Sequence, residues 1–152
     1  MIEKVRTATL HGTAAAAAQL TGNGTAVAVG NAQDIYVVAE IDKGDAAAIT
    51  LTPQRNDAAG TGWIALANNM RIWQAASTAV SDTLVRAADA VAYASAAADT
   101  ILRVVLKINP DSLGLHTGAG TNPITQIRVV VGGGHANDRG SVTAYLVPRY
   151  KP

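Results

Sequence analysis

Residues 132–135, Gly132-Gly133-Gly134-His135, form the first group whose residue types and spacing could do chemistry. A run of glycines after a strand-like segment can cradle a phosphate group or form the oxyanion loop of an esterase. Those sites also require a G-x-S-x-G or G-x-x-x-x-G-K-[ST] motif, or a helical pattern after the glycines, and the sequence has none of them. We therefore interpret the glycines as a flexible hairpin loop that needs positive φ angles.

Residues that could bind a metal ion are dispersed along the chain. The sequence has no cysteine, and its three histidines, His11, His116 and His135, are not spaced for a common site on one element. Three histidines could still converge in space, for example around a threefold axis, but exposed loop histidines are the simpler interpretation. Four aspartates lie in glycine-containing loops, without the twelve-residue calcium motif, and turn formation explains them: Asp42, Asp45, Asp57 and Asp138. We predict no catalytic, metal-binding or cofactor-binding residues and no enzymatic activity.

The composition favours a single domain with a thin core. A chain of 152 residues can bury roughly 70% of the surface that its unfolded form exposes. Phe is absent, aromatic residues make up 4%, and much of the 49% hydrophobic content is alanine, so the core should consist of Val, Ile, Leu and Ala. A net charge of +1 provides no broad basic surface, so we expect no direct contact with nucleic acid.

Alternating apolar and polar residues predict β-strands with one buried face. The clearest runs are residues 34–41, 101–108, 124–131 and 141–147. In the second run Leu102, Val104 and Leu106 share one parity, while Arg103 and Lys107 take the other. Helical segments are not regularly interleaved with these runs. The sequence therefore predicts an all-β fold, an antiparallel β-sandwich or jelly roll, with an extended N-terminal arm.

Turn-forming residues predict how some strands connect. Residues 42–45, Asp-Lys-Gly-Asp, predict a hairpin between residues 34–41 and a strand at 47–51. Proline lacks the N–H that a strand ladder uses, so Pro53 and Pro148 are each expected to end a strand. Residues 83–98 fit both a helical face and a partly apolar strand, and we favour strands because of the sandwich context.

The chain is expected to divide into an arm, residues 1–24, and a single β-sandwich domain, residues 25–152. The arm is rich in alanine, with room for one or two helical turns at residues 14–20, and it can order on a neighbouring subunit or dock on its own domain. Its first residues lack the apolar core of a secretory signal, and residues 14–18 are too short to span a bilayer. We expect synthesis in the cytoplasm without a signal peptide, and no membrane partner.

Two sets of side chains could form binding surfaces. Arg103, Lys107 and Arg128 are expected on one solvent face of adjacent strands, where they either dock an acidic partner or are simply solvated. Trp63 and Trp73 could form a sugar-stacking platform. Burial of both in the core, which has few other aromatic residues, is the simpler expectation.

The whole-chain pattern resembles the head decoration, or cement, proteins and other minor virion structural proteins of tailed bacteriophages that have β-sandwich folds. The resemblance is carried by the Ala-rich residues 1–24, cysteine-free alternating strands, loops of Gly, Asn and Asp, and the ending GSVTAYLVPRY at residues 140–150. These features extend over most of the chain and include no signature motif, so they transfer no residue roles.

The resemblance implies a capsid decoration protein of the virion, which binds the outside of an assembled head and stabilises contacts between capsomers. Its partner would be the major capsid protein, and it would be a homo-oligomer, with a trimer favoured. No cofactor is expected. As contact residues we predict the two chain ends, namely Val5, Arg6, Leu10, Leu20, Arg149 and Tyr150. The alternatives are a carbohydrate- or receptor-binding module of a phage fibre that uses Trp63 and Trp73, or another head or tail structural subunit.

Overall fold

The computed structural model describes residues 5–11, 20, 22–44, 47–57, 62–66, 70–75, 84–86, 92–95, 101–108, 124–133, 135 and 137–149. All regular structure in this part of the chain is β-strand. The strands are β1 (Arg6–His11), β2 (Gly22–Asn23), β3 (Val27–Ala28), β4 (Ala32–Asp42), β5 (Thr50–Asp57), β6 (Ile64–Ala65), β7 (Met70–Ala75), β8 (Leu84–Arg86), β9 (Tyr93–Ala94), β10 (Ile101–Ile108), β11 (Ile124–Gly132) and β12 (Arg139–Pro148).

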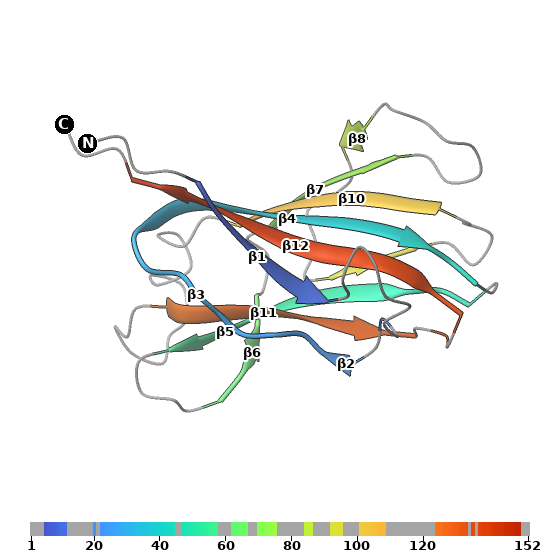
Figure 1. The fold of residues 1–152 in the computed structure, drawn as a ribbon, viewed down its shortest axis with the longest axis horizontal. Helices are drawn as coiled ribbons and strands as arrows, with labels where there is room; N and C mark the ends of the chain where they lie inside the picture. Colours follow the sequence, from blue (N-terminus) through green and yellow to red (C-terminus); the bar gives the residue numbers. More distant parts are fainter. Residues whose placement is uncertain are drawn as a thin grey trace.

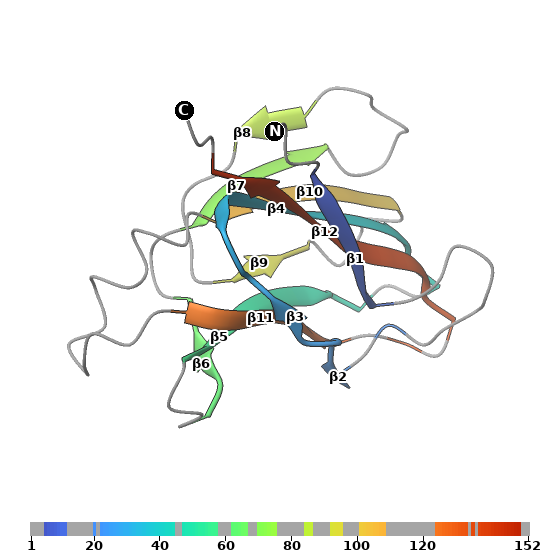
Figure 2. The same ribbon diagram turned by 60° about the vertical axis from the view of Figure 1, so that its left-hand side comes forward.

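The strands form two antiparallel sheets that pack face to face (Figures 1 and 2). The first sheet has the order β1-β12-β4-β10-β7-β8, and the second has the order β2-β11-β5-β6. β3 also pairs with β11, and β9 pairs with β5. The predicted all-β antiparallel sandwich is therefore confirmed.

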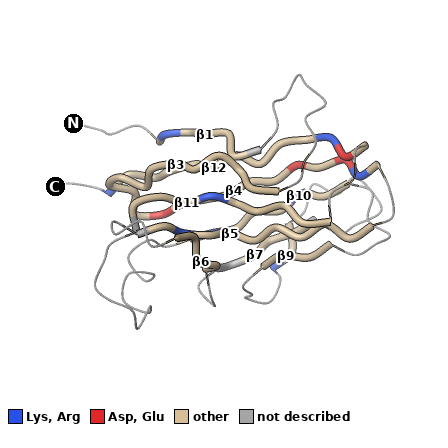
Figure 3. Tube along the Cα trace, turned by 90° about the horizontal axis from the view of Figure 1, so that it is seen from below, with Lys and Arg blue, Asp and Glu red and all other residues tan. Residues whose placement is uncertain are grey.

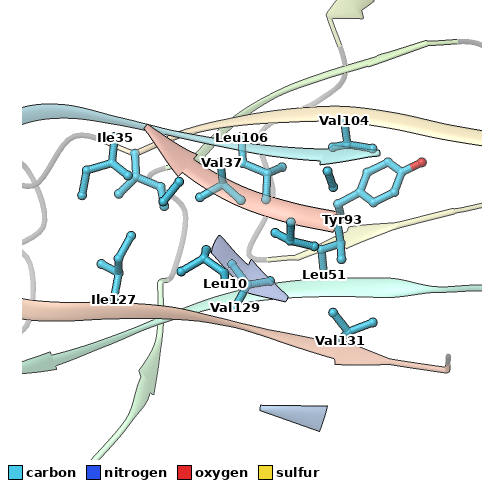
Figure 4. Packing of buried hydrophobic residues seen from close by; sticks show 14 of the residues in the cluster. Leu10, Ile35, Val37, Leu51, Tyr93, Val104, Leu106, Ile127, Val129 and Val131 are labelled. Carbon is cyan, nitrogen blue, oxygen red and sulfur yellow. The ribbon is translucent and has the colours of Figure 1, made fainter. Parts of the chain in front are cut away.

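The core lies between the sheets and is built by the alternation seen in the sequence (Figure 4). Ile35, Val37, Ala39 and Ile41 point inward from β4, and the residues between them are partly or fully exposed. β10, β11 and β12 repeat the pattern with Leu, Val, Ile and Ala, as the composition predicts. Among the described aromatic residues only Tyr93, on β9, is buried in this cluster.

The turn after β4 carries the chain from one sheet to the other. β4 pairs with β12 and β10 in the first sheet, whereas β5 pairs with β11, β6 and β9 in the second. The predicted hairpin between these strands is therefore wrong. Both strands have one apolar face, and a crossing connection buries both faces against each other, whereas a hairpin would place them side by side. The glycine-rich loop from β11 to β12 crosses between the sheets at the same end (Figure 1), so it is not a hairpin either.

Pro53 does not end its strand, contrary to the prediction, because β5 continues to Asp57. The Pro53 carbonyl accepts a hydrogen bond from the backbone N–H of Leu66, 3.0 Å away, next to the short strand β6. The nitrogen and carbonyl of one strand residue point to the same side, so the missing N–H costs the ladder with β11 nothing. Pro148, by contrast, is the last residue of β12, as predicted.

The described residues of the predicted N-terminal arm belong to the sandwich. β1 pairs with β12 in the first sheet, and β2 pairs with β11 in the second. Leu10 and Leu20 are buried in the core. The Arg6 guanidinium donates to the Val29 carbonyl, 2.9 Å away, and so links β1 to the residue after β3. The helical turns expected at residues 14–20 fall outside the described residues apart from Leu20.

Residues 83–98 contain strands where they are described. β8 is the edge strand next to β7, and β9 pairs with β5 through Thr50 and Leu51. The buried Tyr93 ring fills core space that alanine could not fill, and this burial holds β9 against the second sheet.

Candidate interaction surface

The most extensive candidate surface is the outer face of the first sheet, formed by the residues that alternate with the buried ones. We call it the first-sheet outer face. Its members on the four central strands are Ser141, Thr143 and Tyr145 of β12, Tyr36, Val38 and Glu40 of β4, Arg103, Val105 and Lys107 of β10, and Trp73 of β7. Each of these side chains is at least partly exposed.

An uncharged row crosses the middle of this face. Register pairing places Thr143 beside Val38, Val38 beside Val105, and Val105 beside Trp73. Arg86 of the edge strand β8 follows Trp73, and its guanidinium carbon lies 5.4 Å from the centre of the indole ring. Trp, Tyr and Arg beside aliphatic residues are the composition typical of protein interfaces.

A charged pair with an aromatic neighbour lies on one side of the row, two residues from Val105 on β10 and from Val38 on β4. Lys107 Nζ is 3.2 Å from Asp34 Oδ1 and 5.4 Å from the centre of the Tyr36 ring. Hydrogen bonds to Tyr36 and then to Asp34 raise the pKa of Lys107 above its ordinary value of 10.5. Lys107 therefore stays protonated at neutral pH and presents a fixed positive charge on this face.

On the other side of the row, the face has a hollow of about 470 Å³. Two carboxylates of β4, Glu40 and Asp42, lie between Arg103 of β10 and Arg139 of β12. The rest of the lining is Ile41, Ile101, Gly140 and Ser141. The hollow is therefore lined by two acidic and two basic side chains, whose formal charges sum to zero. Figure 3 shows basic and acidic positions close together at one end of the described strands, and long uncharged stretches elsewhere.

Trp63 and Trp73 do not form a common platform. Trp73 lies on the first-sheet outer face, whereas Trp63 precedes β6 and stacks on Arg128, with 4.3 Å from the guanidinium carbon to the ring centre. Arg128 extends from the outer face of β11 in the second sheet, where its Nε donates to Gln54 Oε1 over 2.8 Å. The two indoles thus lie on opposite faces of the sandwich, so a joint sugar-stacking platform is not formed. Neither is in the core, so the expectation that the core would take them is also wrong.

The basic residues predicted to share one face are divided in the same way. Arg103 and Lys107 lie on β10, on the first-sheet outer face, and Arg128 lies on the second sheet. The sequence pattern assigned each residue to the exposed side of its strand but could not say which sheet the strand joins.

The glycine-rich loop holds the fold together at one end of the sandwich. Asp138 is fully buried, and its carboxylate accepts hydrogen bonds from the backbone N–H of Gly44, at 2.7 Å, and of His135, at 2.6 Å. It thereby joins the two loops that cross between the sheets. Gly133 has a φ of 72°, and a Cβ there would collide with the Ala48 carbonyl. The positive φ predicted for this loop is confirmed. Of the described N–H groups of the loop, that of His135 donates to Asp138, whereas that of Asn137 donates to His135 Nδ1.

The described residues include no group of three His, Asp or Glu side chains that could hold a metal ion. His135 is exposed beside Asp138, whereas His116 and the His11 side chain lie outside the described part of the structure. A convergence of the three histidines therefore stays untested.

The predicted contact residues have different environments. Val5 is 50% exposed and Arg149 is exposed, and the pairing of Arg6 with Leu146 brings both to one corner of the first sheet. Leu10 and Leu20 are packed in the core of their own chain, at 2% and 0% exposure, so neither side chain is on the surface that a partner would meet. The Arg6 guanidinium is bound to the Val29 carbonyl of its own chain. Tyr150 lies outside the described residues.

Sequence reasoning missed the first-sheet outer face as a unit. Tyr36, Val38, Val105 and Tyr145 gave a usable signal, because each is an apolar or aromatic residue at the polar parity of its strand. Assembling them requires the strand order, which the alternation does not contain. Comparisons with family models, with curated proteins and with solved structures find no match to this chain. The described residues include no helix that is long and apolar enough to cross a membrane.

Proposed function

We propose that this protein is a non-enzymatic structural protein of a virion, a decoration protein that binds the outside of an assembled phage head and stabilises contacts between capsomers. The proposal joins the resemblance of the chain to phage decoration proteins with the corner of the sandwich formed by Val5 and Arg149. Its partner there is the major capsid protein.

The observation that carries the proposal is the pairing of the first and last strands. β1 and β12 are adjacent and antiparallel, with Arg6 opposite Leu146, so the chain enters and leaves the sheet at one corner. Backbone pairing with β12 and the Arg6 hydrogen bond to Val29 hold this corner against the rest of the sandwich. An exposed valine and an arginine at this corner offer a capsid both apolar contact and a positive charge, without ordering the rest of the domain.

The test uses heads of the virus whose genome encodes this chain, purified without the protein. The wild-type chain is expected to sediment with these heads in a density gradient. The double variant Val5→Asp/Arg149→Glu should not sediment with them, because it replaces apolar contact and positive charge by negative charges. Ile64→Asp is the matched control: Ile64 is similarly exposed, at 46%, but lies on β6 in the second sheet.

Circular dichroism of each variant establishes that the sandwich is folded before binding is measured. Retained binding of the folded double variant would remove the corner as the contact. Failure of the folded wild-type chain to bind the heads, together with its absence from purified particles, would overturn the virion assignment itself.

A further inference from the structure

The central strands of the first-sheet outer face are chemically matched across their register. β4 and β10 are neighbours, and directly opposed residues on them form an acid–base pair, an apolar pair and an aromatic–cation pair. These pairs are Glu40–Arg103, Val38–Val105 and Tyr36–Lys107.

We propose that two copies of this chain pack through their first-sheet outer faces, around a two-fold axis that runs between β4 and β10 and nearly parallel to them. Such an axis places β4 of one copy over β10 of the other. Glu40 then meets Arg103 of the second copy, Val38 meets Val105, and Tyr36 meets Lys107. The three pairs of residue types that lie side by side within one chain are thereby also formed between the two chains.

The flanking strands fit the same arrangement. β12 lies on the other side of β4, and β7 lies on the other side of β10, so the axis places β12 of one copy over β7 of the second. Thr143 then meets Trp73, which sets a small neutral side chain against a large aromatic one. An axis perpendicular to the strands would instead bring Lys107 over Arg103 of the second copy, and like charges in contact disfavour association.

The dimensions of the face suit a dimer. The six strands contain 44 residues in all, and at about 3.3 Å by 4.8 Å for each residue the face spans roughly 700 Å². Stable interfaces bury about 800 Å² on each partner. Stacked twisted sheets cross at about 30°, which the axis provides when it is tilted by about 15° from the strands. A second copy is favoured over a purely acidic or purely basic partner because this face carries both signs of charge. The acids are Asp34, Glu40 and Asp42, and the bases are Arg86, Arg103, Lys107 and Arg139.

Sedimentation velocity of the purified chain over a dilution series tests the association without any virus, so it is independent of the proposed virion function. We expect a species of twice the 15.5 kDa chain mass that dissociates on dilution. Val38→Asp should raise the dissociation constant of the dimer by about 100-fold or more, because dimer formation would bury the aspartate charge in the centre of the interface. Val130→Asp is the matched control, because Val130 is a partly exposed valine on β11, on the outer face of the opposite sheet. It should leave dimerisation unchanged.

A charge exchange between the copies separates direct contact from misfolding. Glu40→Arg alone sets arginine against Arg103, and Arg103→Glu alone sets glutamate against Glu40, so each variant should be monomeric. An equimolar mixture pairs Arg with Glu at both places, and it should form a heterodimer with an affinity within about tenfold of the wild type.

A wild-type chain that is monomeric at millimolar concentration, or that forms a trimer, overturns the two-fold dimer. So does equal dissociation by Val38→Asp and Val130→Asp. If the two single-charge variants fold and fail to associate when mixed, β4 does not lie over β10, and the proposed axis is wrong.

Discussion

At the scale of single residues, Asp138 shows how one side chain acquires a structural task that its sequence position does not reveal. The sequence suggests only a turn former in a glycine-containing loop. In the structure this carboxylate is fully buried and joins two loops that are 94 residues apart in sequence. Buried carboxylates are retained in proteins only when hydrogen bonds replace their lost hydration, and two backbone N–H groups do so here.

Asp138→Ala should lower the free energy of unfolding by about 3 kcal/mol, because the N–H groups of Gly44 and His135 lose their charged acceptor. Urea denaturation followed by circular dichroism measures this change. Asn137→Ala, in the same loop but at an exposed position, should change stability by no more than about 0.5 kcal/mol. Equal effects of the two substitutions would show that the Asp138 hydrogen bonds do not stabilise the fold.

A second prediction at this scale concerns the pKa of Lys107. Its raised pKa means that folding favours the protonated amine, so its contribution to stability is complete below pH 10.5 and is lost as the pH rises through the higher folded pKa. Tyr36→Phe should lower the pKa of Lys107 more than Asp34→Asn does, because the Tyr36 hydrogen bond is the larger cause. Side-chain NMR titration measures both values. An unchanged pKa in both variants would contradict the contacts described here.

At the scale of elements, the two connections that cross between the sheets determine which strands become neighbours. Residues 42–45 have a composition that fits a hairpin, yet the chain there passes over to the other sheet. The crossing loops approach closely, and Gly133 lies against the backbone of Ala48 just before β5. The glycine is required at this point both for its left-handed backbone and for the lack of a side chain.

Gly133→Ala should destabilise the protein by about 3 kcal/mol, since it combines left-handed backbone strain with a collision against the Ala48 carbonyl. Gly22→Ala separates the two effects. Gly22 also has a positive φ, of 78°, but has no neighbour within 4 Å of an added Cβ, so its replacement should cost only about 1 kcal/mol. Thermal and urea unfolding of both variants measure the difference, and similar losses would show that the close approach to Ala48 has no energetic consequence.

At the scale of the whole molecule, the sandwich has two separate outer faces, whereas the sequence pattern led us to expect exposed residues of both sheets on one surface. The first carries Trp73 beside the row of Val38 and Val105, and the second carries Trp63 stacked on Arg128. A partner that binds one sheet therefore leaves the other tryptophan unchanged, which makes each indole a reporter for its own face.

Single-tryptophan variants make this separation measurable. With Trp63→Phe the remaining Trp73 should become less accessible to acrylamide as the concentration rises through dimer formation, because its ring faces Thr143 of the second copy. With Trp73→Phe the quenching of Trp63 should not depend on concentration. Concentration-dependent protection of Trp63 would place the interface on the second sheet, in contradiction of the proposed dimer.

The sequence by itself determined the fold class, the thin aliphatic core and the exposed or buried side of each long strand. These properties follow from alternation along a few residues, because successive strand residues point to opposite faces. Tertiary structure alone decided that β4 and β5 join different sheets, that Leu10 and Leu20 are core residues, and that the two tryptophans face apart. Those outcomes depend on which strands pair over long separations, and pairing is set by how all apolar faces are buried together.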